Sequence, residues 1–144
     1  MVLEEVRADN WQACASLEVE HHQQRFVASV AYYLALCSYG ETPWNPLAVR
    51  VEDKVVGFVM WGIDPTDDSF WIGGLVIDRG HQLRGYGRSV VARLLGRAVE
   101  DGRREAALSY HPENQVARSL YASMGFVETG EVADDEVVAR KPLR

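Results

Sequence analysis

The sequence has no long apolar run and no recognisable leader. Its longest mostly apolar stretch, Phe26 to Cys37, has 12 residues, whereas a helix that crosses a membrane needs about 20. The first residues, Met1 to Glu5, are acidic and lack the pattern of a signal peptide. These absences predict a soluble, cytoplasmic protein with no membrane partner.

Cysteine is also scarce. Two cysteines, Cys14 and Cys37, are too few for a disulfide framework, and we expect both to be small buried hydrophobic residues in helices. No cluster of histidine, cysteine and acidic residues has the spacing of metal ligands, and the adjacent His21 and His22 point to different sides of a helix. The sequence therefore predicts no metal site.

The net charge of −6 is unevenly spread. Residues 79–104 contain seven arginines and two acidic residues, a local charge of +5, so the remainder carries −11. A nucleic-acid-binding protein usually presents a broad basic face, so we expect no nucleic-acid partner. The distribution suits an anionic ligand on one element and a cationic ligand facing the rest. Four of the arginines are expected to solvate the outer face of a helix: Arg93, Arg97, Arg103 and Arg104.

A chain of 144 residues fits one domain, residues 1–144, that buries about 68–70% of its unfolded surface. Apolar periodicity predicts helices from Asp9 or Asn10 to Val19 and from Gln24 to Tyr39. Strands are predicted at Leu47–Glu52, Val55–Ile63, Phe70–Ile77, Ala106–Tyr110, Val127–Glu131 and Glu136–Arg140. The order βααβββαβαββ predicts an α/β fold with a mixed sheet and helices on both faces.

The most informative stretch runs from Gly74 to Arg88. It reads as an apolar strand, a loop containing Gly85 and Gly87, and a helix whose apolar residues recur at the 3.6 period. The first turn of a helix has unbonded N–H groups at the positive end of the helix dipole, a good place for phosphate. We therefore expect a phosphate-bearing ligand at residues 82–88. Walker A and dinucleotide-binding loops are excluded, because Gly87 is followed by Arg-Ser and Val90 replaces a third glycine.

A second informative segment spans residues 114–126. Asn114 is a good N-cap, and Gly125 stands where a left-handed helix end belongs. Asn114, Arg118 and Tyr121 are spaced i, i+4 and i+7, so they share one side of this helix. From the pattern alone, Tyr121 is equally well explained as a core residue on the apolar stripe.

Both segments resemble motifs of the GNAT acetyltransferase superfamily. Gln82-x-x-Gly85-x-Gly87 is similar to motif A, which cradles the pyrophosphate of acetyl-coenzyme A, although a frequent proline is replaced by Arg79 and a frequent glycine by Leu83. The segment from Asn114 to Phe126 resembles motif B. Three shorter stretches, Gln24–Ala28, Val127–Glu131 and Val137–Arg140, resemble a bacterial subgroup described as polyamine (diamine or spermidine) acetyltransferase-like.

This resemblance implies the GNAT fold, with a sheet splayed between its fourth and fifth strands, Phe70–Ile77 and Ala106–Tyr110. It implies an acetyl-CoA-dependent N-acetyltransferase whose pantetheine arm bonds to the strand backbone of Leu75, Val76 and Ile77. The other implied cofactor-binding residues are Gln82, Leu83, Arg84, Gly85, Tyr86, Gly87, Arg88, Asn114 and Arg118. The implied general acid is Tyr121, whose usual pKa near 10 nearly balances that of a thiol near 8.5.

The general base and the acceptor stay open. The fourth strand contains no carboxylate, so base action falls to water or to an acid elsewhere, with Glu18 and Glu20 as candidates that also read as solvated helix residues. Trp71, like Trp44 and Trp61, is a candidate wall of the acceptor pocket or a core residue. A small primary amine is the expected partner and a polyamine fits the acidic balance.

Other acceptors fit the fold equally well: a protein N-terminus, an amino acid or an amine antibiotic. A coenzyme A-binding domain without turnover is the alternative from another functional class. The sequence leaves the oligomeric state open, and a homodimer is the habit of the family.

Overall fold

Seven strands form one mixed sheet in the computed structural model, which describes residues 1–143. The strands are β1 (Val2–Glu5), β2 (Asn45–Val51), β3 (Lys54–Ile63), β4 (Phe70–Ile77), β5 (Glu105–Tyr110), β6 (Val127–Ala133) and β7 (Glu136–Pro142). Their spatial order is β1-β2-β3-β4-β5-β7-β6. The helices are α1 (Trp11–Ala15), α2 (Val30–Tyr39), α3 (Tyr86–Glu100) and α4 (Gln115–Ser123), with short 3₁₀ turns η1 (His21–Gln23) and η2 (Arg79–His81).

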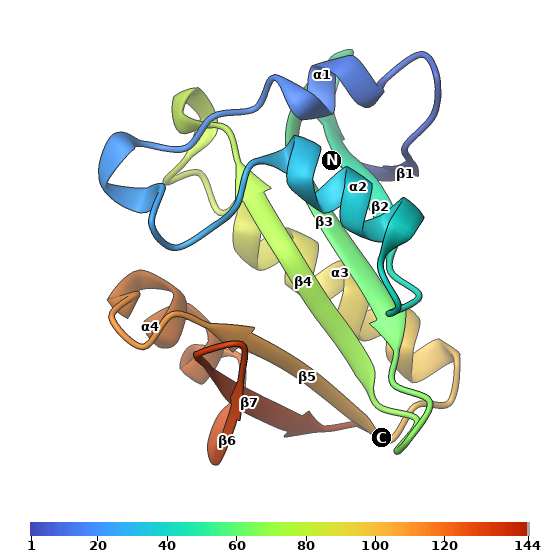
Figure 1. The fold of residues 1–144 in the computed structure, drawn as a ribbon, viewed down its shortest axis with the longest axis vertical. Helices are drawn as coiled ribbons and strands as arrows, with labels where there is room; N and C mark the ends of the chain where they lie inside the picture. Colours follow the sequence, from blue (N-terminus) through green and yellow to red (C-terminus); the bar gives the residue numbers. More distant parts are fainter. Residues whose placement is uncertain (144) are drawn as a thin grey trace.

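The helices cover both faces of the sheet, as predicted (Figure 1). The apolar side of α3 and the ring of Tyr121 in α4 pack with the sheet in one core cluster that includes Leu94 and Phe70. A second cluster on the opposite face joins α1 and α2 to the sheet through Cys14, Val30 and neighbours. We call these two sides the α3 face and the α2 face.

The sheet opens between β4 and β5. These two parallel strands pair only at Phe70 with Ala106 and at Trp71 with Ala107. Beyond those pairs their carboxyl ends diverge, which is visible as the V between β4 and β5 in Figure 1. The predicted fold class, a mixed sheet splayed between the fourth and fifth strands, is therefore confirmed. Helices α3 and α4 follow these two strands, so both begin at the open end.

A bulge distorts β4 where the strands diverge. The register with β3 shifts between Phe58 and Met60, and Gly74 adopts φ +58°. A side chain at Gly74 would meet Tyr33 Cγ of α2 at 3.3 Å and Met60 Cγ at 3.1 Å. Glycine is thus required there, because the position combines left-handed backbone with close approach of a ring.

The first two helices are shorter than predicted. Helix α1 ends at Ala15 instead of Val19, because the backbone of Glu18 is bonded to residues of the loop after β4: its N–H donates to Asp78 Oδ1 (3.0 Å) and its carbonyl accepts from Arg79 N (2.7 Å). Helix α2 begins at Val30 instead of Gln24, and the Ser29 hydroxyl caps it by accepting from Tyr32 N (3.2 Å). Long-range backbone bonds here outweigh the local apolar period.

Both cysteines are free thiols in helices. Cys14 is buried, as expected, and Cys37 is half-buried. Burial raises the pKa of each thiol to about 11. Both therefore stay protonated and unreactive near neutral pH.

The observed start of α2 can be tested by two matched deletions of a hydroxyl group. Ser29→Ala removes the cap and should lower the free energy of unfolding by about 1 kcal/mol. Ser38→Ala lies inside the same helix on an exposed position and should cost nothing, because alanine is the better helix former. Urea denaturation of both variants measures this difference. Equal stabilities would place Ser29 inside a longer helix.

Candidate active site

The N-terminus of α3 presents a run of unbonded amides at the open end of the sheet. Within residues 1–143, no N–H from Leu83 to Arg88 donates to a backbone carbonyl, and the first such bond is Ser89 N to Gly85 O at 3.0 Å. Gly85 caps the helix with φ +81°, a conformation that glycine adopts freely. The loop predicted to bind an anion therefore has free donors at the positive end of a 15-residue helix.

Gly87 is not needed by the fold itself. Its backbone is helical, and a methyl group there would make ordinary contacts of 3.9 Å with Leu120 and 4.0 Å with Leu75. Alanine in a helix is favoured over glycine by about 1 kcal/mol. The missing side chain therefore leaves the first turn of α3 open to a ligand from outside the chain.

Leu83 and the two arginines beside the loop are exposed. Leu83 adopts φ +64° with its side chain fully in solvent, so leucine occupies the left-handed conformation where glycine is frequent in motif A. Non-glycine residues in this region store strain, which is typical of ligand loops. Arg88 Nη2 donates to Ser123 Oγ at 2.7 Å and so links α3 to α4, whereas Arg84 extends into solvent beside the free amides.

The side chain of Gln82 positions the loop. Its Nε2 donates to the carbonyl of Ile77 (3.0 Å) at the end of β4. It also exchanges two hydrogen bonds with the side chain of Gln23 in η1, at 2.9 and 3.1 Å. The residue that opens the motif therefore ties the loop to the strand end and to the N-terminal segment.

The edge of β4 that faces β5 lacks a neighbour over most of its length. Val76 and Ile77 pair with β3 on the other side, and the bulge leaves Leu75 without a β3 partner. Past Trp71 no residue of β4 pairs with β5. The backbone of Leu75 to Ile77 thus has an open side, as the sequence predicted.

The predicted residues of the 114–126 segment are in three different situations. Asn114 caps α4 by accepting from Ala117 N at 3.2 Å, which confirms its predicted capping role. Arg118 donates to Glu128 Oε2 at 2.9 Å, and the same oxygen accepts from the Tyr110 hydroxyl at 2.6 Å. The structure therefore shows Arg118 holding β6 against β5 and α4. Tyr121 lies deeper.

Tyr121 is packed between aromatic rings beside the open end of the sheet. It is 9% exposed, and its ring centroid lies 5.7 Å from that of Tyr110 and 6.0 Å from that of Phe126. Burial, with smaller contributions from the charge of Glu136 and from Tyr110, raises the pKa of Tyr121 to about 12. The expected near balance with a thiol of pKa near 8.5 is thus wrong for the free protein, because a core environment penalises the phenolate.

The carboxylate that acts on Tyr121 is Glu136, which the sequence analysis did not select. Glu18 and Glu20, the earlier candidates, are both exposed near the 78–82 loop: the Glu18 carboxylate lies 3.6 Å from Arg79 Nη2, and the Glu20 backbone bonds Gln23 Oε1. No local signal distinguishes Glu136 from other acids, because its placement follows from the register of β7 on β5.

A segment before α2, residues 20–28, crosses the open end of the sheet. At one side Gln23 bonds Gln82, as described above. At the other side Arg25 Nη1 donates to Glu113 Oε1 (2.6 Å) and Phe26 packs against His111, with ring centroids 5.2 Å apart. The segment therefore links the loop after β4 to the loop after β5.

The three tryptophans proposed as pocket walls have different surroundings. Trp71 lies on the α2 face, where the guanidinium of Arg140 sits 5.5 Å from its ring and its Nε1 donates to Ser69 Oγ at 2.9 Å. Trp44 packs over Gly73, also on the α2 face. Trp61 stacks on Phe70 and belongs to the α3-face core, so its position fits the core alternative.

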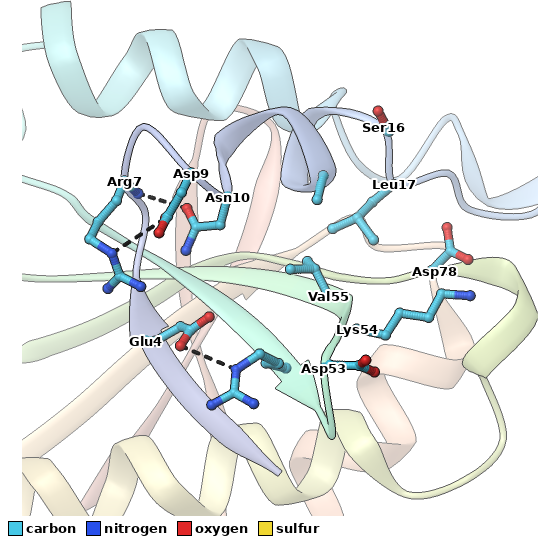
Figure 2. A pocket seen from close by; sticks show the side chains of 12 residues that line it. Glu4, Arg7, Asp9, Asn10, Ser16, Leu17, Asp53, Lys54, Val55 and Asp78 are labelled. Atoms are coloured by element: carbon cyan, nitrogen blue, oxygen red, sulfur yellow. Dashed lines mark hydrogen bonds and ion pairs between the residues drawn. The ribbon is translucent and has the colours of Figure 1, made fainter.

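A surface hollow lies apart from the diverging strands. It has a volume of about 550 Å³ and is bordered by α1, β1 and the β2–β3 turn (Figure 2). Its charges are largely paired within the chain, Glu4 with Arg50 and Arg7 with Asp9. Asp78 is its single link to the loop after β4. We therefore build the site on the diverging strands and not on this hollow.

Two further observations bear on ligands and membranes. No set of three or more histidine, cysteine or acidic side chains is grouped to bind a metal ion within residues 1–143. Over the same residues, no helix has the length and apolar character that a membrane crossing requires.

The open end of the sheet thus combines three chemical elements. Free amides at the start of α3 can bind an anion, unpaired backbone on β4 can bond an extended ligand, and a buried phenol beside them can supply a proton. Such a set suits an enzyme that binds a phosphate-bearing group-transfer donor along a strand edge.

Comparison with known proteins agrees with this geometry. A spermine/spermidine N(1)-acetyltransferase of Bacillus subtilis (strain 168) is 28% identical over 137 residues, covering 88% of each chain. The coenzyme A complex of PaiA N-acetyltransferase from Thermoplasma acidophilum superposes with a TM-score of 0.74 at 14% identity, covering 99% of each chain. A ribosomal-protein-alanine N-acetyltransferase from Escherichia coli gives a TM-score of 0.72 at 19% identity, covering 99% of this chain and 93% of that one.

The model of the acetyltransferase (GNAT) family matches residues 4–126. That range includes the diverging strands, the amide-lined loop and the helix that carries Tyr121. The sequence-based prediction of an N-acetyltransferase is therefore confirmed, and the chain belongs to the acetyltransferase (GNAT) family.

Proposed function

We propose that this enzyme transfers an acetyl group from acetyl-CoA to a primary amine of a small polyamine. One observation carries the proposal: the unbonded amides at the start of α3 and the buried hydroxyl of Tyr121 lie on the two sides of the gap between β4 and β5. Both features lie at the end of the sheet where β4 and β5 separate.

Acetyl-CoA supplies an acetyl thioester and an anionic pyrophosphate, and the described residues fit both. The amides from Leu83 to Arg88 would bind the pyrophosphate, with Arg84 adding positive charge. The open edge of β4 from Leu75 to Ile77 would bond the pantetheine arm, and the Asn114 amide lies at the start of the facing helix α4.

The pyrophosphate assignment can be tested at Gly87. Gly87→Glu should abolish cofactor binding, because it places bulk and negative charge among the free amides. In the wild type, coenzyme A at about 100 times its dissociation constant should stabilise the fold by about 2.7 kcal/mol. Thermal unfolding with and without coenzyme A measures this gain. The matched control is Gly96→Glu, which lies in open space on the same helix and should keep the full gain. Equal gains in both variants would place the cofactor elsewhere.

Tyr121 is the proposed proton donor. The neutral amine nitrogen would attack the thioester carbon, the carbon–sulfur bond would break, and the departing sulfur would take the proton of the Tyr121 hydroxyl. The proton that the nitrogen loses as the amide forms would return to the Tyr121 oxygen, directly or through water. A pKa of about 12 keeps the phenol protonated throughout the neutral range. Burial would also raise the pKa of a thiol bound beside Tyr121. The pKa difference between the phenol that gives the proton and the thiolate that takes it is therefore smaller in the site.

Tyr121→Phe should lower turnover by about 10²–10⁴-fold with coenzyme A affinity nearly intact. Tyr39→Phe, an exposed tyrosine on α2, is the control and should be neutral. Since the folded pKa of Tyr121 is raised, the acid is fully present below pH 10 and is lost only as pH approaches 12. The wild-type pH–rate profile should therefore rise with amine deprotonation and show no Tyr121-dependent fall below pH 11. If turnover falls by less than threefold in Tyr121→Phe, then Tyr121 is a core residue and not the proton donor.

The acceptor proposal rests on charge and on the names of the relatives. The chain outside residues 79–104 carries −11, and a cleft edged by carboxylates concentrates cations. Two curated relatives at 28% identity are named as spermine or spermidine acetyltransferases. An alkylammonium with a pKa of about 10.4 still needs roughly 4.6 kcal/mol to lose its proton at pH 7.

Acceptor choice is measured with spermidine, putrescine, a free α-amino acid and a short peptide at several salt concentrations. We expect spermidine to be preferred, with a kcat/KM that falls as salt screens the acidic surface. A tenfold preference for the peptide or the amino acid, or indifference to salt, would exclude the polyamine. No turnover with any amine would indicate a coenzyme A-binding domain instead.

A further inference from the structure

Glu136 is the first residue of β7 and lies on the α2 face of the sheet. Phe70 and Ile72 belong to the α3-face core, so Trp71 between them points to the α2 face. Trp71 pairs with Ala107 in β5, and Ser109 two residues later shares that face. The Ser109 hydroxyl donates to Glu136 Oε1 at 2.8 Å. The Glu136 carboxylate therefore lies on the same face of the sheet as Ser109 and α2.

The charge of Glu136 contributes to the pKa of two phenols on different elements. Tyr33 of α2 packs over Gly74 at the β4 bulge, and its pKa is raised by burial and, more weakly, by the charge of Glu136. Tyr121 of α4 also has its pKa raised by burial first and by Glu136 second. Ser109 lies beyond Ala107, the last residue of β5 that pairs with β4, so the hydrogen bond from Ser109 places Glu136 beside the part of β5 that has separated from β4.

Glu136 also lacks a cation. The other glutamates on β5, β6 and the loop before α4 are each bonded to an arginine, namely Glu105, Glu113, Glu128 and Glu131. Within residues 1–143, Glu136 has the Ser109 hydroxyl as its side-chain partner and no arginine, lysine or histidine within 4.0 Å. It is half-buried. A partly desolvated carboxylate without a counter-ion is a favourable position for a cationic ligand.

We propose that Glu136, oriented by Ser109, binds the ammonium group of the acetyl acceptor in the space between β4 and β5. This proposal deepens the proposed function and rests on it, since it assumes that the acceptor is a cationic amine. It assigns acceptor binding to β7, whereas the anionic donor is held by the start of α3. The acetyl donor would then reach Tyr121 from the basic start of α3, and the acetyl acceptor from the acidic side at β7.

The test compares Glu136→Gln with Asp135→Asn. Glutamine keeps the size and the acceptor oxygen for Ser109 but removes the charge. Asp135→Asn removes one charge from the neighbouring turn residue, which is exposed with φ +65°, a conformation that asparagine tolerates. For spermidine, Glu136→Gln should raise KM on the order of 10–100-fold with a smaller change in kcat. Asp135→Asn should change KM by less than about threefold.

Ser109→Ala provides a second variant, which leaves the charge but frees the carboxylate, and should raise KM several-fold. Coenzyme A affinity, measured by thermal shift, should be unchanged in all three variants. Equal KM values in Glu136→Gln and Asp135→Asn, with wild-type turnover intact, would overturn the role of Glu136 and leave the proposed function standing.

If wild type turns over no amine, the proposed function fails, and Glu136 is tested by calorimetric binding of spermidine to the coenzyme A-loaded protein. Weaker binding in Glu136→Gln than in Asp135→Asn then supports the ammonium site. Equal binding in both, or no binding to wild type, overturns it.

Discussion

The separation of β4 from β5 is the constraint on which the rest of the molecule depends. Two residue pairs hold the strands together, and each strand then follows a different partner: β4 stays on β3, whereas β5 pairs along its whole length with β7. Strand β4 also bulges at Gly74, which lies close to Tyr33 and Met60, near the point where β4 and β5 separate. Backbone groups left open in this way need another partner, and an extended ligand along the strand edge can provide it.

The same divergence places two helix starts together. Because α3 follows β4 and α4 follows β5, both helices begin at one end of the sheet. The free amides are at the start of α3, and the ring of Tyr121 in α4 lies 5.7 Å from that of Tyr110, the last residue of β5. Segment 20–28 connects the two sides through Gln23 and Arg25. Charge is divided accordingly: basic residues lie along α3 and the loop before it, and Glu136 on β7 has no cationic partner within residues 1–143. In the proposed function, this arrangement would separate an anionic donor from a cationic acceptor and bring both to Tyr121.

Burial determines the pKa of the Tyr121 hydroxyl. Tyr110 and Phe126 enclose its ring, so the hydroxyl keeps its proton far above neutral pH. The hydroxyl of Tyr110, in contrast, is bonded to Glu128 and serves the contact between β5, β6 and α4. The two neighbouring tyrosines thus differ, because within the described residues only the Tyr110 hydroxyl is bonded to a carboxylate.

Local patterns in the sequence were sufficient wherever the structure is local. Gly85 at a helix start, Asn114 as a cap and the apolar period of α3 each depend on nearby residues, so the glycine-capped start of α3 and the order of elements could be predicted. The ends of α1 and α2 were mispredicted, because bonds between Glu18 and the Asp78–Arg79 loop compete with the helical period. Neither the pKa of Tyr121 nor the position of Glu136 could be read from the chain. The first depends on burial by the rings of Tyr110 in β5 and of Phe126 just before β6, and the second on which face β7 presents once its register on β5 is set. Sequence determined the elements and their caps, and the tertiary structure determined the electrostatics of the site, because desolvation and charge act through space between residues far apart in the chain.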